Sequence, residues 1–373
     1  MIESSQRSTW RNADPAMLVT TLLLIGFGLL TIYSADDRDL SFHGAIFKQA
    51  LFTLIGLGVM VAFAAFDYRY LRMLSVPFYA AGLLLLALVL KVGEIIYGAQ
   101  RWFDLKITSF QPSEAAKLAT IIALATFIAF RGPHMKGPLS FAATLALAIV
   151  PAVLIYKEPD LGTALIFLAI WAGMIIIART RLIYLLGCAL ASVPIAWFAW
   201  NFLLHAYQRD RLLVFRHPED HYEAGGYNIV QAKITIGQAG LFGHRFADLA
   251  QFTDTQKLAV STSDYAFAHA MGNFGFLGAM ALFTLYLLLI WRYLRVAQLA
   301  RDDFGQLLAM GAVSVLFFQS FINIGMNVNL LPPVGIPLPF ISAGGTPIVT
   351  LLATQGILQS ILMHRHKLTF GTG

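Results

Sequence analysis

Apolar runs of about twenty residues recur along almost the whole chain, separated by short polar connections. Roughly twenty residues is the length that an α-helix needs to cross the hydrocarbon core of a bilayer. Only 12% of the residues are charged, against about a quarter in soluble domains. The sequence therefore predicts an all-α integral membrane protein of about ten transmembrane helices, forming one polytopic domain over residues 1–373. The expected spans are residues 16–34, 47–66, 75–92, 113–131, 139–156, 161–178, 182–204, 269–291, 305–329 and 338–363.

One connection, at about residues 205–268, is much longer than the others and lies between the seventh and eighth expected spans. It holds seven of the chain's 20 acidic residues and six of its 26 basic ones. Charged side chains are too costly to bury in hydrocarbon without partners. We therefore expect a large extracytoplasmic loop that folds in part as a cap over the helices.

The distribution of Lys and Arg over the short connections sets the expected orientation, because cytoplasmic loops carry an excess of both. With the N-terminus inside, thirteen fall in the inner segments and six in the outer short loops. We therefore expect a cytoplasmic (inner) membrane protein with both termini in the cytoplasm. The net charge of +6 is spread over the loops, which indicates membrane topology rather than nucleic-acid binding.

Charged residues within the spans are the first candidates for function, because an intramembrane charge is costly and is seldom kept without a role. The fourth span contains Glu114 and Lys117, which are three residues apart and share a helix face. Lys117 is expected about one turn below the outer surface. The pair could bind a substrate, or it could only lock two spans together.

Two more charged residues are expected at the same outer face. Arg101 lies beside Trp102 before the fourth span; the cation suits phosphate and the aromatic suits the membrane interface. Trp102 could equally be one member of an aromatic belt. Asp160 precedes the sixth span, where it could contact a substrate or only favour the helix N-terminus by its charge.

The connection over residues 331–347 is apolar but too rich in Pro and Gly to continue a helix. Non-helical backbone at membrane depth is tolerated only where it is buried in protein or lines a cavity. We expect this segment, which includes Ser342, to form a re-entrant rim of the functional site. A rigid turn without a functional role is the alternative.

Asp264, in the run Ser261-Thr262-Ser263-Asp264-Tyr265 of the long loop, is the central candidate. A carboxylate above cations near the headgroup plane suits a general base, or a ligand for a divalent cation such as Mg²⁺ or Mn²⁺. The sequence has no zinc-spaced ligands, P-loop, Gly-x-Ser-x-Gly elbow or dinucleotide fingerprint. These residues point to transfer chemistry on a polyprenyl-phosphate-linked substrate, although an Asp in a polar loop can also be merely solvated.

Several motifs along nearly the whole chain resemble the SEDS family (shape, elongation, division and sporulation proteins), in the family's order. Met326 after Asn-Ile-Gly, and the lack of long cytoplasmic tails, favour the members that act in elongation over those that act in division. The matching stretches are Gly98–Trp102 with Phe110–Glu114 and Lys117; Glu158–Thr163; Gln208–Leu212 with Gly226–Ala232; and Asn323–Met326 with Leu338–Gly345.

The resemblance implies a peptidoglycan glycosyltransferase that polymerises lipid II into glycan strands at the outer face of the cytoplasmic membrane during cell elongation. It also implies a class B penicillin-binding protein (transpeptidase) as partner, and a growing glycan on undecaprenyl pyrophosphate as donor. The family's essential aspartate maps onto Asp264, which we expect to be catalytic and to bind the divalent cation. The expected substrate-binding residues are Lys117, Glu114, Arg101, Arg211, Asp160 and Ser342.

The match to the family is imperfect around Asp264. The family has His-Thr before the aspartate, and this chain has Thr262-Ser263. The family's Glu-Glu pair is replaced by Gly272-Asn273, and its usual tyrosine in the last motif is replaced by Ala343. Two other classes of function remain open: a lipid II transporter (flippase) and a non-catalytic scaffold for a penicillin-binding protein. The outer-face charges, without a midplane ion site, argue against the transporter.

Overall fold

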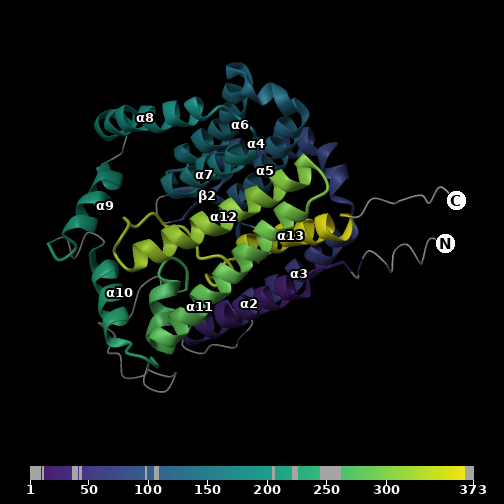
Figure 1. Cartoon of the computed structure of the whole chain (residues 1–373). Helices are drawn as coiled ribbons and strands as arrows, with labels where there is room; N and C mark the ends of the chain where they lie inside the picture. Colours follow the sequence, from purple (N-terminus) through teal and green to yellow (C-terminus); the bar gives the residue numbers. More distant parts are fainter. Residues whose placement is uncertain are drawn as a thin grey trace.

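The computed structural model describes residues 10, 12–35, 41, 44–96, 99–104, 109–203, 206–220, 226–243 and 262–365. Nine of the helices in these ranges are long and apolar enough to cross a membrane, and α7, with 17 residues, is a shorter apolar helix (Figure 1). The expected all-α membrane fold is therefore confirmed. The apolar helices are α2 (Pro15–Ala35), α3 (Ala45–Ala65), α4 (Ser75–Val92), α5 (Pro112–Arg131), α6 (Pro138–Lys157), α7 (Leu161–Ile177), α8 (Leu182–Phe198), α11 (Ala266–Leu299), α12 (Asp303–Asn327) and α13 (Gly345–Met363).

Helices α5, α12 and α13 form the centre of the bundle, with 67% of each span buried. Helix α12 packs against α11, α7 and α5, while α13 packs against α3. The approach of α3 to α13 depends on Gly56, where a Cβ would lie 2.6 Å from Leu352 Cδ1. In lipid, where helices gain little from the hydrophobic effect, such small residues let van der Waals packing hold them together.

Helix α8 lies at the edge of the bundle, at the upper left of Figure 1. Tyr184, in its first turn, packs against Phe141 of α6, but none of its spanning residues is buried, so most of its apolar side chains are left for lipid. It contains Pro194 and continues into the π-helical turn η3 (Ala199–Leu203). The helical structure therefore extends to Leu203, close to the expected limit of this span at residue 204.

The long polar segment contains two described helices, α9 (Ala206–Arg216) and α10 (Gly226–Gln238), so the expected cap is partly helical. It ends earlier than predicted, because α11 begins at Ala266. Helix α11 is 34 residues long and is kinked at Gly275, which has φ +67°. The turn after α10 satisfies the backbone groups that this kink frees, because the Gly240 oxygen accepts the Phe276 N–H at 2.9 Å.

The connection between α4 and α5 forms a small antiparallel sheet that the sequence did not predict. Its strands, in the order β1-β2-β3, are β1 (Glu94–Ile96), β2 (Ala99–Asp104) and β3 (Ser109–Phe110). Strands β1 and β3 have only three and two residues, too few to show alternation, and β2 (Ala-Gln-Arg-Trp-Phe-Asp) does not alternate apolar with polar residues. The sheet matters for function because β2 carries Arg101 and packs against α4 and α5.

The last span begins later than predicted, at Gly345 rather than residue 338. Residues 332–338 have no regular structure and residues 339–342 form a turn. Proline at positions 337 and 339 excludes helical hydrogen bonding there. The non-helical connection between α12 and α13 therefore extends over residues 328–344.

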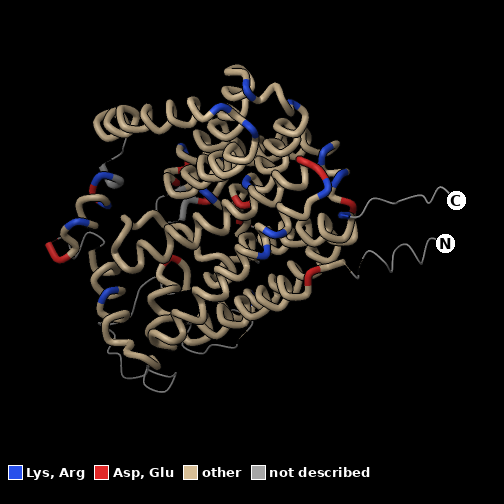
Figure 2. The backbone as a smooth tube through the Cα atoms, in the orientation of Figure 1, with Lys and Arg blue, Asp and Glu red and all other residues tan. Residues whose placement is uncertain are grey.

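Helix α2 begins and α13 ends at one end of the bundle, and α9 and α10 lie at the other (Figure 1). Charged residues gather at the first of these ends and along α9, whereas the long stretches of α2, α11 and α12 are nearly free of charge (Figure 2). Short 3₁₀ turns, η1 (Tyr68–Arg72) and η2 (Gly132–Lys136), join successive helices at the end where α2 begins. This arrangement is that of a multi-pass membrane protein.

Candidate functional site

Asp264 lies in the turn at residues 262–265 that leads into α11, at the end of the bundle that carries α9 and α10. Its backbone oxygen accepts hydrogen bonds from the side-chain amides of Asn323 and Asn327, both at 3.0 Å. The two asparagines are four residues apart and share one face of α12. Asn327 Oδ1 also accepts the Ala268 N–H at 3.0 Å. Helix α12 therefore fixes the backbone of Asp264 and leaves its carboxylate unconstrained by these bonds.

The connection between α12 and α13 packs against the same turn. Ser342 Oγ donates to the Ser263 oxygen at 2.6 Å, and the Ala343 N–H donates to the Thr262 oxygen at 2.7 Å. At Gly335, whose φ is +68°, a Cβ would lie 3.5 Å from Asp264 Oδ2. The connection thus touches the carboxylate itself, as expected of a rim around the candidate site.

Ser342 was expected to bind substrate, but its hydroxyl is already engaged inside the protein. Besides donating to Ser263, it accepts the Leu338 N–H at 2.9 Å, and the residue is buried. These bonds hold the two segments together. We therefore assign Ser342 to positioning the Asp264 turn.

Arg101 and Asp160 meet as expected of a shared site. Arg101 Nη1 lies 3.4 Å from Asp160 Oδ2, and the same guanidinium donates to the backbone oxygens of Glu158 (3.0 Å) and Pro159. Asp160 also caps α7, because its carboxylate accepts the Thr163 N–H at 3.0 Å and the Thr163 hydroxyl at 2.9 Å. Asp160 is therefore a helix cap that is also paired with Arg101, and its contact with a substrate stays a prediction.

The electrostatic environment links Asp264 to these residues. Burial raises the pKa of the Asp264 carboxyl above its ordinary value, and the charge of Asp160 raises it further. The charges of Arg211, on α9, and of Arg101 act in the opposite direction. Asp264, Arg211, Arg101 and Asp160 therefore form one electrostatically coupled group.

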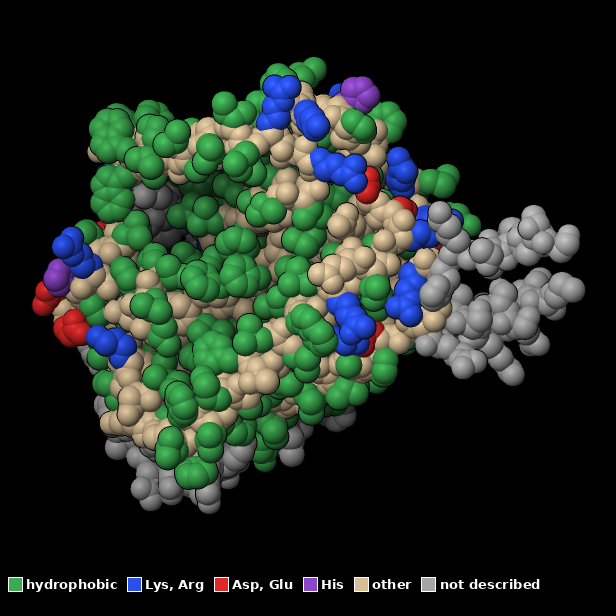
Figure 3. Space-filling view, viewed as in Figure 1, with side chains coloured by type: hydrophobic (Ala, Val, Ile, Leu, Met, Phe, Trp, Pro, Cys, Tyr) green, Lys and Arg blue, Asp and Glu red, His purple; other side chains and the backbone are tan. Residues whose placement is uncertain are grey.

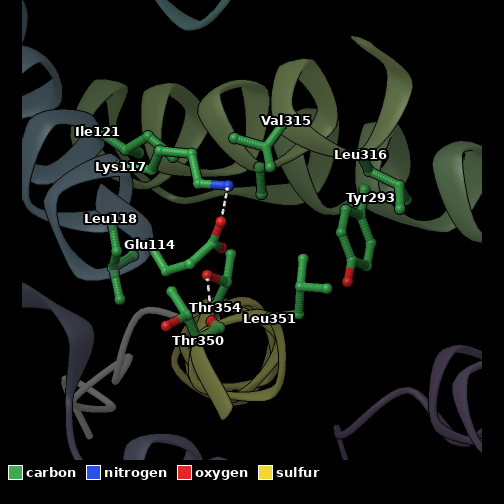
Figure 4. Close-up of a pocket in the computed structure, with 11 residues that line it drawn as sticks. Glu114, Lys117, Leu118, Ile121, Tyr293, Val315, Leu316, Thr350, Leu351 and Thr354 are labelled. Carbon is green, nitrogen blue, oxygen red and sulfur yellow. Dashed lines mark hydrogen bonds and ion pairs between the residues drawn. The ribbon is translucent and has the colours of Figure 1, made fainter. Parts of the chain in front are cut away.

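Glu114 and Lys117 form the expected pair, with 2.8 Å between Lys117 Nζ and Glu114 Oε1 (Figure 4). Both are buried, and they line a cavity of about 20 Å³ between α5, α12 and α13, together with Tyr293 and Thr354. Asp264 does not line this cavity, and Lys117 is not among the charges that shift the pKa of Asp264. The expectation that Lys117 and Asp264 serve one site therefore stays a prediction.

The sequence did not single out Glu158, which lies beside Asp160. Its side chain is buried, and neither of its carboxylate oxygens has a hydrogen-bond partner among the described residues. Burial first, and then the charge of Asp160, raise the pKa of Glu158 to about 8, against a lowering effect of Arg101. We therefore expect Glu158 to be protonated at pH 7. Nothing in the pattern Glu-Pro-Asp distinguishes this buried acid from a solvated one.

The donor set limits how a divalent cation could bind. No group of three or more His, Cys, Asp or Glu side chains that could hold a metal exists among the residues that the structure describes. Asp160 already uses both carboxylate oxygens. Asp264 remains as a single carboxylate, which fits a cation held by one or two carboxylates together with substrate phosphates.

Comparison with known proteins agrees with this picture. The peptidoglycan glycosyltransferase MrdB of Escherichia coli (strain K12) is 36% identical over 363 residues, covering 95% of each chain. A solved structure described as coordinating polymerization and crosslinking in a peptidoglycan synthase complex matches with a TM-score of 0.82 and 27% identity, covering 95% of this chain and 99% of the other. The crystal structure of the rod shape determining protein RodA of Thermus thermophilus matches with a TM-score of 0.70 and 26% identity, covering 95% and 98%.

The model of one protein family, described as "Cell cycle protein", matches residues 15–367, which is nearly the whole chain. The motifs around Arg101, Asp160, Asn323 and Ser342, which carried the resemblance in the sequence, line the site in the structure. The chain therefore belongs to the FtsW/RodA/SpoVE family of cell cycle proteins, which is the SEDS family.

Proposed function

We propose that this chain is a peptidoglycan glycosyltransferase that polymerises lipid II into glycan strands at the outer face of the cytoplasmic membrane during cell elongation. Membership of the family and the name of the Escherichia coli relative support the activity. The observation that carries the proposal is the placement of Asp264. Its backbone is fixed by two asparagines of α12, and its carboxylate is coupled to Arg211, Arg101 and Asp160.

In the proposed reaction, the growing glycan on undecaprenyl pyrophosphate is the donor and the sugar 4-hydroxyl of lipid II is the acceptor. A bond forms between the acceptor oxygen and the anomeric carbon of the donor, while the bond from that carbon to the pyrophosphate breaks. Asp264 takes the hydroxyl proton as a general base. Its raised pKa brings it closer to the operating pH, which is the range where a general base works best.

Cations close to Asp264 neutralise the pyrophosphate leaving group in this proposal. Arg101 and Arg211 are the two that act on Asp264, and a guanidinium binds phosphate oxygens in a bidentate manner. Lys117 is neutralised by Glu114 in its own cavity. We therefore give Glu114 and Lys117 a supporting role within the bundle and assign the leaving group to the arginines.

A divalent cation, Mg²⁺ or Mn²⁺, is part of the proposal as a ligand shared between Asp264 and the substrate phosphates. When bound, it would supply further positive charge at the pyrophosphate. The protein would contribute Asp264 alone, because Asp160 is engaged by Arg101 and Thr163. Removal of the metal by a chelator should then lower the polymerisation rate without unfolding the protein.

A class B penicillin-binding protein is the proposed partner. The solved complex that this chain resembles joins polymerization to crosslinking, and crosslinking is the reaction of a transpeptidase. The proposed orientation places α9, α10 and Asp264 outside the cytoplasm, with both termini inside. The excess of Lys and Arg at the opposite end supports this orientation.

The experiment that tests the proposal supplies purified chain in detergent with lipid II and a divalent cation. Detergent micelles have no second compartment, so a transporter produces nothing, whereas a glycosyltransferase produces glycan polymer. A scaffold also produces nothing on its own. Polymer formed by the wild-type chain and lost in Asp264→Ala supports the proposal; equal amounts of polymer from both would remove Asp264 from the reaction.

A further inference from the structure

A basic pocket lies at the end of the bundle opposite to Asp264, where α2 begins and α11 ends. Its volume is about 160 Å³, enough for roughly five water molecules and therefore for a phosphate group. Three arginines and one aspartate line it, and we call it the arginine pocket; they are Arg292, Arg295, Arg365 and Asp14.

Asp14, which is the acid among the described residues of the arginine pocket, is paired with one of the arginines. Arg292 Nε donates to Asp14 Oδ2 at 2.7 Å, and its Nη2 donates to Oδ1 at 2.5 Å. Asp14 also accepts the Met17 N–H at 3.1 Å. Arg295 lies over the ring of Trp291 at 5.8 Å and pairs with no carboxylate among the described residues. Among the described residues, three arginines and one aspartate line the pocket, so its described lining is predominantly basic.

The arginine pocket lies at the level of the membrane surface. Arg295 is near the end of α11, roughly 40 Å along the helix from Ala266 at 1.5 Å per residue, so the pocket and Asp264 are separated by about the thickness of a bilayer. Trp291 is 51% exposed beside it, and tryptophan is enriched at membrane–water interfaces. Figure 3 shows Lys and Arg side chains gathered at this end and hydrophobic side chains over the adjoining helices.

A separate apolar groove begins about two helical turns from the pocket along the same two helices, and it extends to Tyr33 of α2 and Ile46 of α3. It has a volume of about 760 Å³ and is lined by Leu22, Gly26 and Leu30 of α2 and by Leu285 of α11, among others. Leu285 lies seven residues before Arg292, two helical turns deeper on the same face. On α2, Leu22 and Gly26 follow Pro15 of the pocket by seven and eleven residues, which again keeps one face.

We propose that the arginine pocket and this groove together bind one anionic phospholipid from the leaflet at that end of the bundle. The phosphate would lie among the arginines, and the acyl chains would follow the groove between α2 and α11. A guanidinium matches phosphate in geometry and charge, and basic pockets between transmembrane helices suit anionic headgroups. The site is separate from the glycosyl transfer site, which lies at the other end of the same helices.

Displacement of a fluorescent phosphatidylglycerol from the full chain in detergent tests this proposal. The competitors are phosphatidylglycerol, phosphatidylcholine with the same acyl chains, and glycerol 3-phosphate, which has no chains. The double variant Arg295→Gln/Arg365→Gln should bind phosphatidylglycerol about 25-fold more weakly, or about fivefold for each arginine. The matched control Arg72→Gln/Arg181→Gln removes two exposed arginines outside the pocket and should change the affinity by less than about twofold.

A second variant tests the groove without touching the arginines. Gly26 lines the groove and a Cβ there meets nothing within 4 Å, so Gly26→Leu places a side chain in the groove. It should weaken phosphatidylglycerol binding, whereas Gly58→Leu, at an exposed glycine of α3 with open space around it, should not. Retained lipid II polymerisation shows that each variant is folded.

Three results would each overturn the proposal. Phosphatidylcholine competing as well as phosphatidylglycerol would mean that only acyl chains are bound. Glycerol 3-phosphate competing as well as the lipid would mean that the pocket holds a soluble anion. Unchanged affinity in both the arginine variant and Gly26→Leu would mean that the lipid binds elsewhere.

Discussion

Asp264 owes its placement to its backbone and its reactivity to its surroundings. Burial and Asp160 raise the pKa of its carboxyl, while Arg211 and Arg101 lower it. A general base must be deprotonated, so the polymerisation rate should fall as the pH drops through this raised pKa. Removing a positive charge raises the pKa of a nearby acid further. The pH at which the polymerisation rate falls therefore depends on whether the arginines are present.

We therefore predict that Arg211→Gln moves the acid limb of the pH–rate profile for lipid II polymerisation to higher pH. The matched control is Arg216→Gln, on the same helix and also exposed, which should leave the limb in place. The rate at high pH should fall as well, by about tenfold or more, because Arg211 also neutralises the leaving group. Superimposable limbs for the two variants would show that Arg211 does not act on Asp264.

Glu158 makes a separate prediction about stability. Its pKa is about 8 in the folded chain, against an ordinary value of 4.5. Below pH 4.5 the acid is protonated in both states; between pH 4.5 and about 8 only the unfolded state ionises. The free energy of unfolding should therefore fall by about 1.4 kcal/mol per pH unit over this window, and the fall should level off once the folded form ionises above it.

Glu158→Gln should remove this slope, because glutamine has no proton to lose. Denaturant unfolding of the detergent-solubilised chain between pH 5 and 8 gives the free energy of unfolding at each pH. The contribution of Glu158 to the slope is the difference between wild type and variant. Glu219→Gln, at an acid whose side chain is 65% exposed, is the control and should keep the wild-type slope. A Glu158→Gln slope equal to that of the wild type would mean that Glu158 is already ionised in the folded chain.

At the scale of elements, the connection between α12 and α13 can hold the Asp264 turn only because its backbone packs closely against Gly28 of α2. A Cβ on Gly28 would lie 2.5 Å from the Phe340 oxygen and 2.8 Å from Ile341 Cα. Both neighbours are backbone, so a side chain at position 28 has to displace the segment that carries Ser342. That displacement would be passed to Ser263 through the hydroxyl bond.

Gly28→Ala should therefore lower lipid II polymerisation by about tenfold to a hundredfold, the range expected when catalytic groups shift by about 1 Å. Gly26→Ala lies two residues away on the same helix, where a Cβ meets nothing within 4 Å, and should retain the wild-type rate. Membrane insertion of both variants is measured alongside. A fully active Gly28→Ala would mean that the connection does not position Asp264.

The sequence predicted the connection itself but not its contacts. Proline and glycine exclude a helix over residues 331–344, and membrane depth requires that such backbone be buried, so a rim could be foreseen. Its hydrogen bonds to Thr262 and Ser263 join residues about eighty positions apart, and no local pattern records such pairs. Asn323 and Asn327 did leave a signal, two amides four residues apart on one helix face, but their shared target is the Asp264 backbone.

At the scale of the whole molecule, hydropathy was enough for the fold class, because the length of an apolar run is set by the bilayer. That α8 has no buried residue was not foreseeable, since its composition resembles that of the packed spans. The joint role of Lys117 and Asp264 stays a prediction, because the sequence does not show how the helices that carry them are arranged around a substrate.

The orientation of the molecule is a prediction that labelling can check. The chain has a single cysteine, Cys188, so Cys188→Ala gives a background without thiols. In that background, Arg216→Cys on α9 should react with a membrane-impermeant maleimide in intact cells. Arg365→Cys, just after α13, should react only after permeabilisation. The reverse pattern would place Asp264 in the cytoplasm and exclude polymerisation at the outer face.

The central claim is that the Asp264 carboxylate performs the chemistry, and lipid II polymerisation by Asp264→Asn tests it most directly. Asparagine keeps the backbone oxygen that Asn323 and Asn327 hold, so the variant should insert and fold as the wild type does. We predict that purified Asp264→Asn yields no glycan polymer, while Asp220→Asn, at an exposed acid of the same long segment, yields wild-type amounts. Wild-type amounts of polymer from Asp264→Asn would contradict the account.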